Sequence, residues 1–176
     1  MFNHDNELLR FNSGNAFGIT KDDDTVHFFG KVLGGKLTEA EETVKATFGD
    51  GTSFKGLGPG ECDFEVTIAQ LTNENVSQIN SLKGELRKAF YMNGKNIGGA
   101  DMDIYIPELM ITGSKEIPMG PGQLQTIVIK GSCAPQSENV NVAPSEVMPD
   151  DFPTKAVTDA QTSNSPYYLL AEKEPA

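Results

Sequence analysis

The chain has 176 residues, of which 38% are hydrophobic and 22% charged, a composition that is typical of globular proteins and excludes full disorder. Its 14 basic residues stand against 25 acidic ones, so the net charge is −11. Gripping nucleic-acid phosphates or anionic lipid requires a basic surface, and this charge excludes both roles. No secretory signal and no apolar run of about 20 residues is visible, so we expect a soluble protein of the cytoplasm or of an assembly formed there.

Glycine and proline divide the chain into three parts. Residues 1–15 are polar and charged and predict an N-terminal arm. All 18 glycines lie between Gly14 and Gly131, so residues 16–133 predict a loop-rich domain of ordinary size. Residues 134–176 contain six of the ten prolines and seven acidic against two basic residues, which predicts an extended segment, disordered on its own, in place of a second domain.

Alternation of apolar and polar residues is the strongest structural signal. From Cys62 to Ile68 every even position is apolar and every odd one polar, which predicts a strand with one buried face. The preceding Gly56–Gly60 has the composition of a turn. Residues 36–48 fit a helix or a strand, and their Thr and Val content favours a strand. Further strands are expected at 16–20, 25–32, 43–48, 102–111 and 124–130.

One segment has helical spacing instead. Apolar residues recur between residues 73 and 92 at intervals of three and four, and Thr72 or Asn73 can cap the start. Gly84 lowers the helix propensity of this segment without breaking its pattern. The predicted fold class is therefore mainly β: a β-sandwich or barrel with one flanking amphipathic helix and an extended C-terminal segment.

A proline interrupts one of the expected strands. Pro107 implies an edge position or a bulge, and Pro118–Gly122 forms a loop, so residues 104–130 predict a hairpin.

The sequence contains little that could support catalysis. Cys62 and Cys133 lack CxxC spacing, and we interpret them as small buried residues in a reducing compartment in preference to a single bridge. His27 lies in an expected strand without an orienting partner, and residues 22–24 lack the ligand pattern of a calcium loop. We expect no catalytic residue, no metal and no cofactor.

The order of the elements resembles one known family, the bacteriophage tail tube (major tail) proteins. The resemblance covers about residues 16–133 and is carried by Phe29–Leu37, Thr38–Val44, Gly60–Ile68, the helix, Ile117–Gln123 and Leu124–Lys130. It implies a structural virion protein, not an enzyme, whose copies form stacked hexameric rings around a DNA conduit in the virion, assembled in the host cytoplasm.

The resemblance also implies which residues meet partners. Its partners would be further copies of the chain and other tail proteins, with DNA as cargo that does not stick and no membrane contact. Candidates for the subunit interfaces are Phe2, Leu8, Leu9, Phe11, Leu37, Glu39, Glu41 and Val44. Candidates for the lumen wall, with the outer solvated face as an equal alternative, are Asp63, Glu65, Asp101 and Asp103.

Two other classes of protein remain open. An acidic β-domain with an extended arm also fits a capsid decoration or head–tail joining protein, which clamps neighbouring shell subunits. A monomeric ligand-binding β-sandwich would present an aromatic-lined patch, yet the chain has no tryptophan and only four tyrosines.

Overall fold

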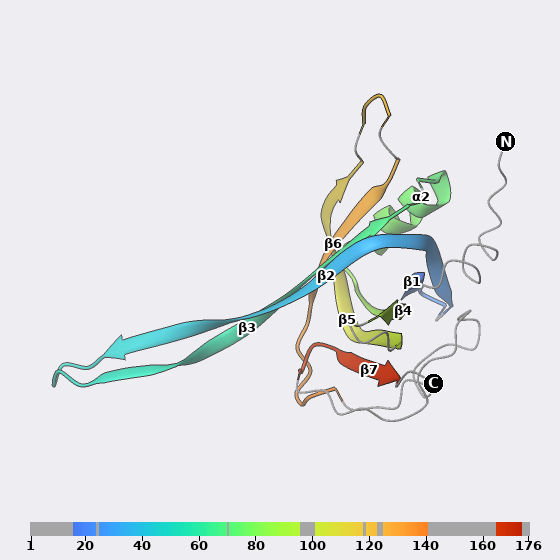
Figure 1. The fold of residues 1–176 in the computed structure, drawn as a ribbon. Coiled ribbons are helices and arrows are strands. Elements are labelled where there is room, and N and C mark those ends of the chain that lie inside the picture. Colours follow the sequence, from blue (N-terminus) through green and yellow to red (C-terminus); the bar gives the residue numbers. More distant parts are fainter. Residues whose placement is uncertain are drawn as a thin grey trace.

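The computed structural model describes residues 16–23, 25–69, 71–95, 101–117, 119–122, 125–140 and 165–173. They form β1 (Ala16–Thr20), β2 (Val26–Thr47), β3 (Ser53–Ile68), α2 (Asn73–Leu82), β4 (Leu86–Lys95), β5 (Asp101–Glu116), β6 (Ile127–Cys133) and β7 (Leu169–Lys173). This part of the chain is mainly β with one helix, as the sequence predicts (Figure 1).

The sheet closes on itself. Its strand order is β4-β1-β2-β3-β6-β5-β7, and an additional β4–β5 pairing joins the two sides into a six-stranded antiparallel barrel. Closure removes the free edges of the barrel strands. The interior is filled by aliphatic residues and by Phe17, whose ring stacks on Phe29 and Phe64 with centroids 5.7 and 5.1 Å apart.

The alternation from Cys62 to Ile68 is confirmed. All four apolar residues of this run are buried, while Asp63 is exposed and Glu65 half-buried. The expected hairpin of residues 104–130 is also present, because β5 and β6 pair antiparallel on either side of the Gly/Pro loop. Residues 36–48 adopt the favoured strand conformation and continue β2 through to Thr47.

The helix is shorter than the sequence predicts. It ends at Leu82, followed by Lys83 in extended conformation and by Gly84 at φ +77°. A positive φ is easily adopted by glycine and ends a helix, so the prediction that Gly84 lies inside the helix is wrong. The helical spacing past this point is misleading because Ala89 and Phe90 are both buried in β4, one on each face of the strand.

The predicted turn at Gly56–Gly60 is also wrong, because these residues lie within β3. The register pairs Glu41 with Gly60 but Thr43 with Leu57, so β3 holds one more residue than β2 over this stretch. Such a bulge tolerates a proline, which has no N–H for the ladder. Glycine and proline here therefore mark a bulge in a long strand.

Pro107 lies where β5 changes partners. On one side β5 pairs with β6 from Leu109 onward and with β7 up to Tyr105, so β6 and β7 follow one another along the same side of β5. On the other side, β5 pairs with β4, where Arg87 pairs with Leu109 and Ala89 with Ile106. Between these two pairs β5 holds one more residue than β4. The expected bulge at Pro107 is therefore present, and the proline lies in the gap between β6 and β7.

The part of the C-terminal segment that is described lies against the barrel. Besides the β7 pairing, Gln136 N donates to Pro166 O at 2.8 Å and Val140 N donates to Ser165 O at 3.0 Å. Tyr167 is buried in the core, and its hydroxyl donates to Gly60 O at 2.6 Å. This contact holds the segment against β3 where the strand leaves the barrel.

Candidate assembly surfaces

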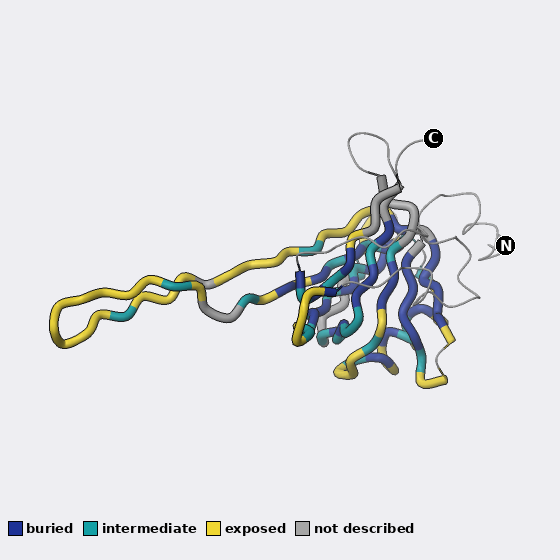
Figure 2. The backbone as a smooth tube through the Cα atoms, turned by 90° about the horizontal axis from the view of Figure 1, so that it is seen from below, coloured by how far each residue is buried: buried dark blue, intermediate teal, exposed yellow. Residues whose placement is uncertain are grey.

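A long hairpin dominates the shape of the molecule. β2 and β3 pair from Val32–Ile68 to Thr47–Ser53, with two register shifts along the way, and their outer halves project far beyond the barrel (Figures 1 and 2). β1 covers the edge of β2 only up to Lys31, and β6 covers the edge of β3 only from Asp63 onward. Within the described residues, the hairpin beyond these points has two edges without a neighbouring strand.

The tip of the hairpin, residues 43–57, has two different faces. Directly opposed residues share a face, so Val44 and Gly56 lie on the same side as Ala46 and Phe54. A methyl group at Gly56 would meet the Phe54 ring at 2.7 Å, so this ring lies over the glycine. The other face carries Leu57 with Thr43 and the opposed pair Lys45 and Lys55.

The apolar side chains of the tip are open to solvent. Phe48 and Phe54 are each 57% exposed, Val44 is 44% exposed and Leu57 is 71% exposed. The turn between the strands is ordered by Asp50, whose carboxylate accepts from Thr52 Oγ1 at 2.6 Å and from Thr52 N at 2.9 Å. These hydrogen bonds lower the pKa of Asp50. A rigid turn thus presents an unusually apolar surface to water.

The predicted interface residues fall into two groups. Leu37, Glu39, Glu41 and Val44 all lie on β2 of the hairpin; Leu37 is half-buried against the core and the other three are exposed. Phe2, Leu8, Leu9 and Phe11 lie outside the described residues. The structure therefore brings the first group onto one hairpin, where Leu37 lies nearest the barrel and Val44 nearest the tip.

Two aromatic residues of the tip are absent from the interface residues predicted from the sequence. Phe48 and Phe54 flank the polar stretch 49–53 symmetrically, and this spacing is a usable signal for a hairpin whose two strands present one apolar face. Leu57 was missed because it lies in the segment interpreted as a turn.

The lumen candidates are not equivalent. Asp63 and Glu65 lie on the outer face of β3, as the alternation predicts. The Glu65 carboxylate has Lys36 Nζ at 3.8 Å on one side and Lys130 Nζ at 4.0 Å on the other, so a row of alternating charge crosses β2, β3 and β6. On these residues the charges balance, two acidic against two basic, and do not form a purely acidic wall.

The two remaining lumen candidates lie on β5. The Asp103 residue is only 3% exposed, opposite Ala171 of β7, so its expected place on a wet strand face is wrong. β7 pairs with this part of β5, and the alternation within β5 does not indicate that pairing. The backbone of Asp101 continues β5, and its side chain lies outside what the structure describes.

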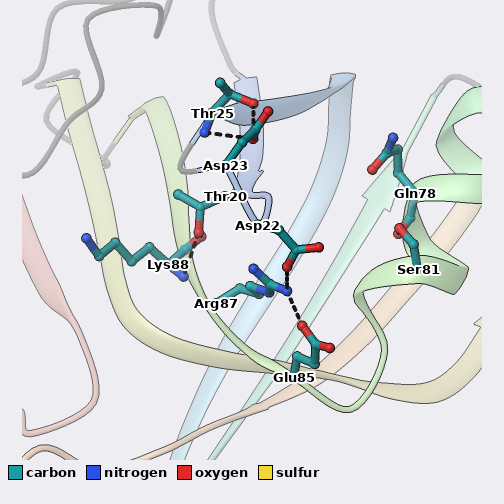
Figure 3. A network of polar contacts seen from close by, with 9 residues as sticks. All are labelled: Thr20, Asp22, Asp23, Thr25, Gln78, Ser81, Glu85, Arg87 and Lys88. Atoms are coloured by element: carbon teal, nitrogen blue, oxygen red, sulfur yellow. Dashed lines mark hydrogen bonds and ion pairs between the residues drawn. The ribbon is translucent and has the colours of Figure 1, made fainter.

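A polar network ties the β1–β2 turn to the start of β4 (Figure 3). Arg87 of β4 donates to Asp22 of the turn and to Glu85, and the contact with Asp22 is the main reason that the pKa of Arg87 is raised. Asp23 accepts from Thr25 N at 3.1 Å within the same turn. The acidic turn therefore serves a structural contact with an arginine.

His27 is engaged in a structural role. Its side chain is 8% exposed, and its Nε2 lies 3.0 Å from Asn75 Oδ1 at the start of α2. In the described part of the chain no three His, Cys, Asp or Glu residues gather as metal ligands, and no helix is long and apolar enough to cross a membrane.

Comparison with known proteins gives distant likenesses in fold. No family model and no curated protein matches the chain. Among solved structures, it is similar to a chain of the virion of a native gene transfer agent particle, with 12% identity over 70% of this chain and 92% of the other and a TM-score of 0.46. It is similar to the SPP1 tail tube protein, with 15% identity over 69% and 73% of the two chains and a TM-score of 0.48. It is also similar to Hcp1 of Flavobacterium johnsoniae, with 11% identity over 67% and 88% and a TM-score of 0.41.

Proposed function

We propose that this chain is a structural subunit of a phage tail tube, in which copies join in hexameric rings and the rings stack into a conduit for DNA. The single observation that carries the proposal is the projecting β2–β3 hairpin, with its unpaired edges and its apolar tip. The solved structures named above include tail and virion proteins, but the proposal depends on the hairpin.

The hairpin edges favour assembly with further copies. An exposed strand edge is a template for pairing with another chain, and proteins usually keep such edges short or charged. Among the described residues, the edge of β2 has no neighbouring strand from Leu33 to Thr47, and that of β3 has none from Ser53 to Glu61, where only the Tyr167 side chain reaches Gly60. A closed ring of copies would cover such edges and limit the assembly to a finite size.

The tip favours contact between copies in a head-to-tail manner. The tip of the hairpin projects away from the barrel (Figure 2), and no described residue of the same chain covers Phe48, Phe54 or Leu57 there. We therefore expect another molecule to bury them. An apolar surface on one part of a subunit that meets a different part of the next generates rings or filaments. Stacked rings satisfy this geometry, with the predicted arm residues Phe2, Leu8, Leu9 and Phe11 adding to the same contact.

The outer face of β3 is a suitable wall for passing DNA. The lysines beside it, Lys36 of β2 and Lys130 of β6, each lie within 4.0 Å of the Glu65 carboxylate, which competes with a phosphate for both. Asp63 adds an exposed carboxylate on the same strand. We therefore place Asp63 and Glu65 at the lumen, where the duplex slides without being gripped, and assign the chain to the virion, assembled in the host cytoplasm. The role is structural and involves no catalytic step or cofactor.

Electron microscopy and sedimentation of the purified chain test the proposal. The wild-type chain should form rings or tubes about 100 Å across, a size estimated from subunits of about 20 kDa around a hole as wide as a duplex. The double variant Phe48→Ser/Phe54→Ser should remain monomeric with unchanged thermal unfolding. The control is Leu86→Ser, because Leu86 is 51% exposed on the barrel, and this variant should assemble normally. A wild-type chain that stays monomeric at high concentration, or a double variant that forms tubes, would contradict the proposal.

Charge reversal tests the lumen wall separately. Tubes of the Asp63→Lys/Glu65→Lys variant should retain duplex DNA at low salt, whereas wild-type tubes should release it, because uncompensated lysines bind phosphates. Glu85→Lys serves as the matched control on a different surface. Equal release by all three tubes would place Asp63 and Glu65 on the outer face.

A further inference from the structure

The two cysteines of the chain face each other across neighbouring strands. The β3–β6 register pairs Asp63 with Ser132, so Cys62 and Cys133 stand opposite one another one step further along. Both are buried on the core side, with 1% and 5% exposure, and both are free thiols. The sequence alone favours two small buried residues over a bridge, because the register between distant strands cannot be derived from sequence spacing.

Their positions meet the geometric requirement of a disulfide. Opposed residues of an antiparallel pair have Cα atoms about 4.5–5.5 Å apart, which lies within the range of about 4.4–6.8 Å that disulfides span. The side chains of an opposed pair also point to the same face of the sheet, so both sulfurs lie in one place. The two thiols are hydrogen-bonded to each other.

This contact makes the two thiols chemically unequal. Cys133 donates to the sulfur of Cys62, which lowers the pKa of Cys62, while the same bond and burial raise the pKa of Cys133. Because the thiolate is the reactive species, Cys62 is the first nucleophile and Cys133 the resolving thiol.

We propose that Cys62 and Cys133 are a site of reversible oxidation, at which a small-molecule disulfide such as oxidised glutathione converts the thiol pair into a cross-strand bridge. The Cys62 thiolate attacks the glutathione disulfide, forming a mixed disulfide and releasing one glutathione thiolate. Cys133 then loses its proton and attacks the sulfur of Cys62, releasing the second glutathione. Two protein thiols are oxidised, one glutathione disulfide is reduced, and the two protons end on the two glutathione thiolates.

The bridge would fix the base of the hairpin. Cys62 is the last residue of β3 before the strand loses its β6 neighbour, and Tyr167, beside it in the core, binds Gly60 two residues further out. A bond between β3 and β6 at this point joins the projecting part of β3 to the barrel covalently. Oxidising surroundings such as a virion surface would form the bridge, while a reducing cytosol would keep both thiols free. The chemistry does not depend on the proposed function.

Refolding in glutathione redox buffers tests the proposal on the full chain, since unfolding gives the oxidant access to both buried thiols. After alkylation, mass spectrometry of the oxidised wild-type chain should show no free thiol, no bound glutathione and the loss of two hydrogen atoms. The bridge encloses about 70 residues, so the melting temperature should rise by about 10 °C, and a reductant should reverse the rise. Cys62→Ala and Cys133→Ala should each show no such rise.

The mass measurement on the wild-type chain stands even if a variant folds poorly. Two alkylated thiols after refolding in oxidised glutathione would overturn the proposal. So would a mixed disulfide with glutathione that does not resolve, or a bridge between two chains on a non-reducing gel.

Discussion

The substitution Asn75→Ala should be among the most damaging single changes outside the apolar core. Asn75 is the third residue of α2 and is 3% exposed. Its Oδ1 lies 3.0 Å from His27 Nε2, and its Nδ2 donates to Phe29 O at 3.0 Å. One side chain thus joins the helix to two residues of β2. Glu74 adds an oxygen 3.8 Å from His27 Nδ1.

The position of Phe29 in β2 explains why this bond matters. The β1–β2 register pairs Gly18 with Phe28 but Ala16 with Lys31, so β2 has a bulge at Phe29–Gly30, where Gly30 has φ +90°. A bulge disturbs the ladder and leaves backbone groups that need other partners. The amide of Asn75 supplies a partner for the carbonyl of Phe29.

The magnitude follows from the two buried groups that lose this partner. A buried donor or acceptor left without its hydrogen bond costs about 1–3 kcal/mol, so the loss of both bonds should lower the free energy of unfolding by about 2–6 kcal/mol. Domains of this size are stable by about 5–15 kcal/mol. The melting temperature of a chain of this length changes by about 2–4 °C per kcal/mol, which gives a fall of about 4–24 °C.

Thermal and urea unfolding of the unassembled chain measure this effect. Ser81→Ala is the control, because Ser81 lies on the same helix with an exposed hydrogen bond from its Oγ to Gln78 O, and its loss should stay within about 0.5 kcal/mol. Asn75→Asp retains an acceptor for His27 but no donor for Phe29 O, and should lie between the two. An Asn75→Ala variant as stable as Ser81→Ala would refute the argument.

Two further predictions concern the turns. The pKa of the Asp50 carboxyl should lie below its ordinary value of 3.8 in an NMR titration, and Thr52→Val should raise it, because the hydroxyl of Thr52 donates to the ionised form. The ordering of the tip should therefore be complete above about pH 4 and lost as the pH falls through the lowered pKa. An unchanged titration in Thr52→Val would contradict this. Gly84→Ala should lower the free energy of unfolding by about 1–2 kcal/mol, because it forces a residue with a side chain into φ +77°. The control Gly34→Ala, which has open space around its Cβ position, should change the free energy of unfolding by less than about 0.5 kcal/mol. Equal unfolding curves for the two variants would contradict the strain at Gly84.

The sequence predicts the fold class well because the barrel strands with one wet face show alternation. β1, the inner part of β3 and the β5–β6 hairpin all follow from apolar pattern and turn composition. The errors occur where the pattern is ambiguous. β4 is buried on both faces, so its apolar residues do not alternate, and they extended the helical spacing of α2 past Gly84. Composition alone also could not separate a Gly/Pro bulge from a Gly/Pro turn at residues 56–60.

The candidate assembly surface could be predicted from the sequence only in part, because it depends on pairing between distant strands. Glu39, Glu41 and Val44 were interface candidates only through the family resemblance, and the structure places them on the hairpin. That Asp103 is buried depends on β7, whose pairing with β5 joins residues about 70 apart in sequence. The opposition of Cys62 and Cys133 depends likewise on register between distant strands. Local patterns carry no information on such pairings.

The barrel contains the core that stabilises the chain, whereas the hairpin carries the surface that we propose for assembly. The β4–β5 pairing closes the barrel within one chain, and β7 lengthens the sheet along β5, so the core with Phe17 and Ile129 is complete without a partner. The hairpin beyond Cys62 adds no residue to that core, yet it holds the tip aromatic residues Phe48 and Phe54 in water. Changes at the tip should therefore alter association and leave unfolding unchanged, while changes such as Asn75→Ala should do the reverse. An element that exposes apolar side chains and adds nothing described to the core is explained by a contact with another molecule, and this is the physical reason for proposing that the hairpin forms the subunit interface.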